Sequence, residues 1–207
     1  MIKRINDCKF ILEVGEIEKQ QVDAIFVWTT PTLNSGDSTF IKTHKEAGSV
    51  IYEECLEATM KYGKQDINKQ FYIPAGQTII TRGGNLEAYT LIHGVMPNYK
   101  VKVQRDNRQV LLNNLIIMGS QLVKAYADMN FPIVNIIFPP IPELIYGKVE
   151  NDDIKVFLKA ILRLQEFKKV SIMCTTQEEY DKYEKIFRKL TIPFWERIIN
   201  KVIKLEF

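Results

Sequence analysis

The stretch from 132 to 140, PIVNIIFPP, constrains the fold more than any other part of the chain. It is almost continuously apolar and lacks the alternation of apolar and polar residues typical of a strand with one face in water. A strand of this kind must be covered on both faces, as the central strands of α/β proteins are. The run therefore predicts a sheet enclosed between two layers of helices.

The rest of the chain alternates strand-like and helix-like segments around this run. Asp37 or Ser38 is a candidate N-cap for a helix that would extend to Tyr62, where Gly63 ends it, and Asn151 or Asp152 is a candidate cap for a later helix. We therefore expect one domain over 1–207, a three-layer α/β/α fold with a central mixed sheet. Residues 195–207 form a possible terminal extension, either a contact surface for a protein partner or an edge strand. The other strand-like segments are 8–17, 24–30, 71–84, 89–97 and 168–176.

Composition excludes several classes of protein. The apolar and charged fractions, 46% and 26%, are those of an ordinary globular chain, and the net charge of +3 comes without a Lys/Arg block, so nucleic acid is not indicated as a partner. No apolar run reaches the roughly 20 residues of a membrane span, and the N-terminus lacks the apolar core of a signal peptide. The three cysteines are far apart in sequence, which favours reduced structural thiols and an intracellular protein.

Five segments, in the right order, resemble the macro domain, a family whose fold binds ADP-ribose. GEIEKQQVDAIFVWTT resembles the pattern G-D-I-T followed by V-D-A-I-V-N-A-A-N, and STFIKTHKEAGSVIYEEC resembles the first long helix of the family. IPAGQTIITRGGNL and LIHGVMP resemble two of its strands, while FPPIPELIYG is in register with F-P-x-I-S-T-G-I-Y-G. These segments lie at 15–30, 38–55, 73–86, 91–97 and 138–147.

The resemblance implies several ligand-binding residues. Asp23 matches the aspartate of V-D-A, which implies a carboxylate that reads the adenine amino group; the alternative is that Asp23 caps the turn before the strand at 24–30. Ile145, Tyr146 and Gly147 match I-Y-G, with Tyr146 placed to stack on the distal ribose or, alternatively, packed in the core. Gly36 and Ser38 fall in the first phosphate-binding loop.

The catalytic positions of the family are replaced here. Its N-A-A-N falls on residues 28–31, so that the second asparagine becomes Pro31, and the acidic residue of one hydrolase class becomes Phe40. Neither side chain can act as a general base. Asn34, one loop position away, is the candidate substitute for the lost asparagine. We therefore assign no catalytic residue, and lean against an enzyme.

The second phosphate loop carries Pro142, Glu143 and Leu144 where the family has S-T-G, and the first loop gains Asp37. Carboxylates repel a pyrophosphate, so either these side chains point away, or the ligand is not a plain pyrophosphate, or the two hold a cation such as Mg²⁺. His44 and His93 match family histidines of structural use, with no cysteine, aspartate or second histidine placed beside them in sequence. We read both as packing residues and assign no metal and no cofactor.

Three functions remain open at this point. The first is a non-hydrolytic binding module for ADP-ribose or a related nucleotide, whose partner would be ADP-ribose or an ADP-ribosylated protein. The second is a scaffold or assembly protein that has kept the fold without a nucleotide ligand. The third is an ADP-ribosyl hydrolase with relocated groups, which the replacements at Pro31 and Phe40 disfavour.

Overall fold

The computed structural model describes residues 1–129, 133–143 and 147–191. Its strands are β1 (Ile2–Ile5), β2 (Cys8–Val14), β3 (Ala24–Thr29), β4 (Lys64–Gln65), β5 (Phe71–Tyr72), β6 (Thr78–Arg82), β7 (Thr90–Val95), β8 (Asn135–Phe138) and β9 (Lys169–Cys174). Its helices are η1 (Ile17–Lys19), α1 (Ser38–Ala47), α2 (Val50–Tyr62), α3 (Lys102–Asp106), α4 (Arg108–Met129), α6 (Asn151–Ile161) and α7 (Gln177–Thr191). The single domain over 1–207 stays a prediction, and segment 195–207 lies outside the described residues.

One mixed sheet of seven strands organises the fold, in the order β1-β2-β9-β8-β3-β7-β6. The strands from β2 to β7 in this order are parallel, whereas β1 and β6 at the two edges are antiparallel to their neighbours. The chain leaves β7 on one side of β3 and returns through α4 to β8 on the other side. The ends of β3 and β8 are therefore a switch point, where open α/β sheets place their ligands.

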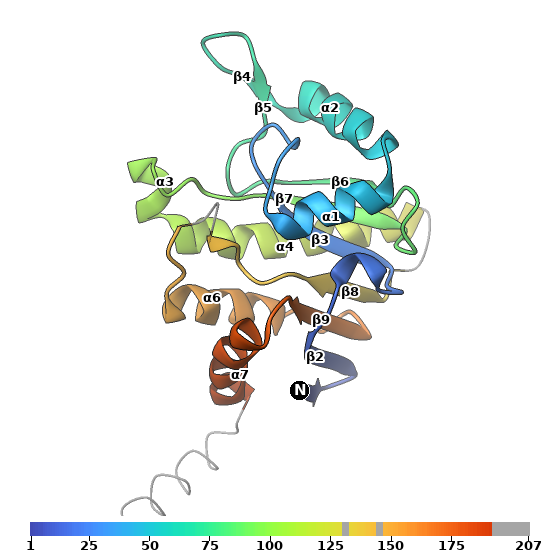
Figure 1. The fold of residues 1–207 in the computed structure, drawn as a ribbon, viewed down its shortest axis with the longest axis vertical. Helices are drawn as coiled ribbons and strands as arrows, with labels where there is room; N and C mark the ends of the chain where they lie inside the picture. The colour runs from blue at the N-terminus through green and yellow to red at the C-terminus, as the bar shows by residue number, and fades with distance from the viewer. Residues whose placement is uncertain (130–132, 144–146, 192–207) are drawn as a thin grey trace, which may run out of the picture.

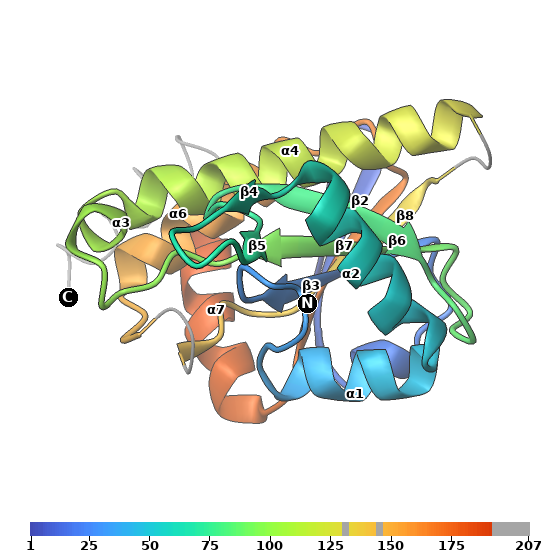
Figure 2. The same cartoon turned by 90° about the horizontal axis from the view of Figure 1, so that it is seen from above.

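Helices cover both faces of this sheet, and Figure 2 shows α1 and α4 on opposite sides of the strands. One core lies under α4, α6 and α7 and contains Phe26, Trp28 and Phe157, while the other lies under α1 and α2 and contains Ile25, Phe40 and Ile51. The apolar run gives β8, whose Ile136, Ile137 and Phe138 are all buried. The prediction of a three-layer fold with a mixed sheet is confirmed.

The helix predicted to run to Tyr62 is two helices, because Gly48 interrupts it. Gly48 has a φ of 90°, a left-handed conformation that side-chain-bearing residues rarely adopt, and a Cβ there would lie 2.8 Å from the Asn85 amide nitrogen. The break lets α2 leave the direction of α1, and contacts of α2 with β5 and β6 follow. Cys55, which belongs to α2, therefore lies on the face of the sheet that α2 covers.

A buried carboxylate joins α4 to α6. Asp153 accepts from the Glu150 N–H at 3.0 Å and from the Gln109 amide at 3.1 Å, and it pairs with the Arg108 guanidinium at 3.1 Å. The N-cap of α6 is therefore Glu150, in a capping box with Asp153, rather than the predicted Asn151 or Asp152. No helix within the described ranges has the length and apolarity that would let it cross a membrane.

Candidate functional site

The strands β3 and β8 part before they end. They pair only through Ala24–Ile136 and Ile25–Ile137, and their carboxyl ends continue into the loop 30–37 and into a second loop that is described over 139–143. We call the topological switch point at these two strand ends the switch crevice. The predicted phosphate loops are the same two segments, so the fold brings them to the topologically expected place.

Trp28 fills the gap below the crevice. Its side chain is fully buried, its ring contacts Phe26 edge-on at 4.6 Å between centroids, and its Nε1 donates to the carbonyl oxygens of Pro140 at 2.7 Å and Pro139 at 3.3 Å. The indole therefore replaces the missing strand pairing with a side-chain bond. Trp28 belongs to the core and joins the two loops from beneath.

The first loop is closed by its own hydrogen bonds. The Thr30 N–H donates to the Ser35 carbonyl at 3.0 Å, and the Pro31 carbonyl accepts from the Ile73 N–H at 2.7 Å. A Cβ on Gly36 would lie 2.5 Å from both the Phe40 Cβ and the Trp28 carbonyl oxygen, so the space that this glycine leaves is used by the chain itself. The loop is therefore a turn held in shape by its own hydrogen bonds and by the packing at Gly36.

Asn34 points away from this crevice. It is exposed, its Oδ1 accepts from the Thr32 hydroxyl at 2.6 Å, and it lines a cleft of about 490 Å³ together with Tyr52 and Phe71. The proposed substitution of Asn34 for the lost asparagine stays a prediction, and this geometry does not support it.

The two extra carboxylates each have a partner. Asp37 caps α1 by accepting from the Phe40 N–H at 2.9 Å, and burial raises the pKa of its carboxyl. Glu143 is exposed and pairs with Lys182 of α7 at 3.3 Å. Of the three explanations that the sequence left open, the one in which these side chains point away from a ligand agrees with both contacts.

The last predicted residues lie around the second loop. Gly147 has a φ of 84°, and a Cβ there would lie 2.8 Å from the ring of Tyr99, so its conformation and its packing both require glycine. Ile145 and Tyr146 lie outside the described residues. The predicted I-Y-G contact to the distal ribose therefore stays a prediction.

A small cleft adjoins the switch crevice where the carboxyl ends of β2 and β9 meet the start of α1. Its volume is about 70 Å³, and Ser38 and Lys42 of α1 face Glu16 across it. Glu16 also pairs with Lys19, and the hydrogen bond from Lys19 lowers the pKa of the Glu16 carboxyl. The cleft thus combines the positive end of a helix, an ammonium group and a carboxylate. It is lined by Gly15, Glu16, Ile17, Glu18, Ser38, Thr39, Lys42, Met173 and Thr175.

Asp23 lies at the amino end of β3, at the other end of the strand from the switch crevice. It precedes the first residue of β3, and its Oδ2 accepts from the N–H groups of Val134 and Asn135, both at 2.8 Å. The structure thus gives Asp23 a backbone-capping role and does not bring it to the other predicted site residues. Sequence reasoning missed Glu16, although it occupies the aspartate position of the quoted G-D-I-T pattern directly after a strand.

A second group of side chains meets under α1 and α2, contrary to the expectation from sequence. His44, Cys55 and His93 are buried, with one potential ligand atom from each within 4.8 Å of the others. Burial lowers the pKa of His44 to about 4 and that of His93 to about 3, and it raises the pKa of the Cys55 thiol to about 12. Cys55 is therefore a neutral thiol and no nucleophile.

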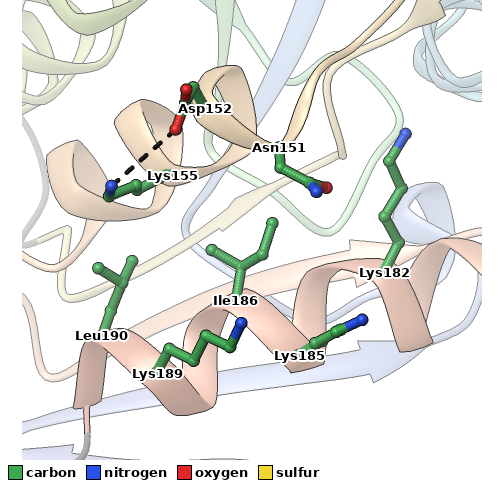
Figure 3. A pocket seen from close by; sticks show the side chains of 8 residues that line it. All are labelled: Asn151, Asp152, Lys155, Lys182, Lys185, Ile186, Lys189 and Leu190. Atoms are coloured by element: carbon green, nitrogen blue, oxygen red, sulfur yellow. Dashed lines mark ion pairs between the residues drawn. The ribbon is translucent and has the colours of Figure 1, made fainter.

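A larger cleft of about 510 Å³ lies between α6 and α7, and its Lys182 pairs with Glu143 of the second loop. Figure 3 shows Ile186 and Leu190 rising from α7 toward α6 between the lysine side chains. Its one carboxylate, Asp152, pairs with Lys155 at 3.9 Å. The cleft attracts anions but presents no positioned acid or base, so we do not place the function there. Its lysines are Lys155, Lys182, Lys185 and Lys189.

Known proteins resemble this chain over most of its length. The macro domain family model matches residues 32–148. The chain is 29% identical to a macro domain-containing protein of Caldanaerobacter subterraneus subsp. tengcongensis over 88% of this chain and 97% of that protein. It is 25% identical to the O-acetyl-ADP-ribose deacetylase of Escherichia coli (strain K12), over 83% and 91% of the two chains.

Solved structures are similar over nearly the whole chain. The Oceanobacillus iheyensis macrodomain with ADP superposes with a TM-score of 0.79 and 26% identity, covering 92% of this chain and 95% of that one. A mutant of the same macrodomain with ADPR gives the same TM-score and covers 97% of that chain. With its mixed sheet, its two switch-point loops and the match over residues 32–148, the chain belongs to the macro domain family.

Proposed function

We propose that this chain is a binding module for ADP-ribose or a related nucleotide that does not hydrolyse its ligand. The arrangement of the small cleft carries the proposal. The N-terminus of α1 and Lys42 stabilise a diphosphate, and Glu16 can accept from the exocyclic amino group of a base. ADPR and ADP, which the titles of the Oceanobacillus iheyensis structures name, are ligands of this chemistry. An ADP-ribosylated protein presents the same group and is the partner we propose.

The two positions where the resemblance implies catalytic groups support the non-hydrolytic part of the proposal. Pro31 has no N–H, and its carbonyl is occupied by the Ile73 N–H. Phe40 is buried and stacks on His44 at 3.7 Å between ring centroids. A proton acceptor is therefore missing at both positions. The relatives named deacetylases make hydrolysis the outcome against which this proposal has to be tested.

One observation favours the scaffold as a second candidate. The small cleft holds about 70 Å³, whereas sites for small molecules usually measure roughly 300–1,000 Å³. The space beside Gly36 is also filled, by Phe40 and by the carbonyl of Trp28. A nucleotide therefore requires the start of α1 or the loops around it to move outward. A chain that has lost its ligand would keep this closed form.

Calorimetric titration of the full chain with ADP-ribose, with and without Mg²⁺, separates these functions. We expect a 1:1 complex, weakened at least tenfold by Lys42→Glu. Lys45→Glu serves as the control, because Lys45 is an exposed lysine of the same helix outside the cleft. No heat at millimolar ADP-ribose in either titration would leave the scaffold. Release of ADP-ribose from a modified protein would contradict the non-hydrolytic part.

A further inference from the structure

Three elements bring metal-binding side chains together beneath α1 and α2, outside the nucleotide cleft. His44 comes from α1, Cys55 from α2 and His93 from β7, and one potential ligand atom of each lies within 4.8 Å of the other two. All three side chains are buried, two of them completely. Cys55 Sγ lies 4.0 Å from His93 Nδ1 and 3.9 Å from its Nε2.

The ring nitrogens of His44 are the unusual feature of this group. Neither Nδ1 nor Nε2 has a hydrogen-bond partner among the described residues, although His44 is fully buried. Buried polar atoms in proteins almost always have a partner, so two orphaned nitrogens on one ring require an explanation. Phe40 and Tyr52 contact the ring at 3.7 and 5.2 Å between centroids, and they offer it apolar surface only.

We propose that His44, Cys55 and His93 together bind one transition-metal ion of the Zn²⁺ type. Two imidazole nitrogens and one sulfur are a donor set that suits zinc, and three protein ligands leave a fourth position open. Tetrahedral bonds of 2.0–2.3 Å would hold the ligand atoms about 3.4–3.6 Å apart. The side chains thus need to contract by little more than an ångström from the spacing seen here.

The surroundings fit this role. The Thr81 hydroxyl contacts His93 Nε2 at 2.8 Å, which fixes the ring as outer partners of metal-bound histidines do. Cys55 also lines the cleft of about 490 Å³ between α2 and β5, which gives an ion a path from solvent. The charged neighbour of Cys55 on its own helix, Glu54, is already paired with Arg82 of β6.

Binding of the metal ion requires the release of one proton, which comes from the Cys55 thiol. An imidazole binds a metal through a ring nitrogen that carries no proton, whereas the Cys55 thiol must lose its proton to the solvent as the sulfur–metal bond forms. Each ion bound therefore releases one proton.

Cobalt(II) added to the chelator-treated full chain under reducing conditions tests the proposal. We expect a thiolate-to-cobalt charge-transfer absorption that saturates at one ion per chain, that Zn²⁺ abolishes, and that Cys55→Ser removes. Cys8→Ser, which alters another buried free cysteine, should leave the absorption in place. Its absence from folded wild-type protein, or its persistence in Cys55→Ser, would overturn the assignment.

A second readout covers the case in which Cys55→Ser folds poorly. Zn²⁺ should raise the thermal midpoint of the wild-type chain and of Cys8→Ser, and it should leave that of His93→Gln unchanged. Equal shifts in all three proteins would mean surface binding and would overturn the proposal. Neither measurement involves a nucleotide, so the outcome is independent of the proposed ligand of the small cleft.

Discussion

The indole nitrogen of Trp28 donates to the carbonyl oxygen of Pro140 at 2.7 Å, across the place where β3 and β8 separate. This bond ties a strand of one half of the sheet to the loop that follows the other half. The proline-rich loop can supply carbonyl acceptors although its prolines lack N–H groups. The loop therefore takes part in the core through its oxygens.

Trp28→Phe tests this bond, because phenylalanine keeps most of the ring and loses the donor. The Pro140 carbonyl would be left buried without a partner, at a cost of about 1–3 kcal/mol, and the smaller ring would leave a void. We expect the free energy of unfolding in urea to fall by about 2–4 kcal/mol. A fall below about 0.5 kcal/mol would mean that the bond contributes nothing to the fold.

Asp153→Ala should be among the most damaging substitutions in the described part of the chain. It would take the buried acceptor from the Glu150 N–H and the Asp153 carboxylate from Arg108, whose side chain is 26% exposed, so we expect a loss of about 2–4 kcal/mol. Asp152→Ala is the matched control, since Asp152 is exposed and pairs with Lys155 only at 3.9 Å. Urea unfolding of the two variants should differ accordingly.

Tyr183 makes the stability sensitive to alkaline pH. Its hydroxyl accepts from the Ile141 N–H at 2.8 Å, and burial raises the pKa of the phenol well above its usual value of 10. The unfolded chain releases this proton near pH 10 while the folded chain retains it, so the free energy of unfolding falls as the pH rises above about 10.

The slope expected from one such group is at most about 1.4 kcal/mol per unit of pH. Tyr183→Phe should remove this part of the alkaline slope while lowering stability at pH 7 by about 1–3 kcal/mol, because Ile141 loses its acceptor. Urea midpoints of both proteins from pH 7 to 11 measure the two effects. Identical slopes would contradict the assignment to Tyr183.

A pair of carboxylate substitutions separates binding from stability. Glu16→Gln should weaken ADP-ribose binding about tenfold and leave urea unfolding unchanged, because Glu16 lies in the cleft on an exposed turn. Asp23→Ala should do the reverse, with a loss of about 2–3 kcal/mol, since the Val134 and Asn135 N–H groups lose their acceptor. The opposite pattern would return the base-reading role to Asp23.

The fold could be predicted from sequence because its signals are local. The apolar run of β8 and the five quoted segments each reflect burial or a turn within a few residues, and their order fixes the topology. One exception was the helix expected up to Tyr62, which Gly48 divides into α1 and α2. Its φ of 90° and its close packing against Asn85 belong to the folded chain, and no local sequence pattern reveals them.

The site was harder to predict because it depends on whether a residue lies at the amino end or at the carboxyl end of the strands. Asp23 and Thr30 flank the two ends of β3. They are close in sequence and belong to the same motif, but they lie a full strand length apart. The group of His44, Cys55 and His93 was missed for a different reason. Its members come from α1, α2 and β7, and a local pattern does not show that these three elements meet.

The short ladder between β3 and β8 divides the sheet into two blocks, β1-β2-β9-β8 and β3-β7-β6. Within each block the neighbouring strands share four to six register pairs, against two across the seam. The pairing of β3 with β8 is therefore the shortest in the seven-stranded sheet, and one switch-point loop follows each of these two strands. A ligand that contacts both loops would resist the separation of β3 from β8. In pulling experiments, the force at the first rupture should therefore be higher with the ligand bound than without it.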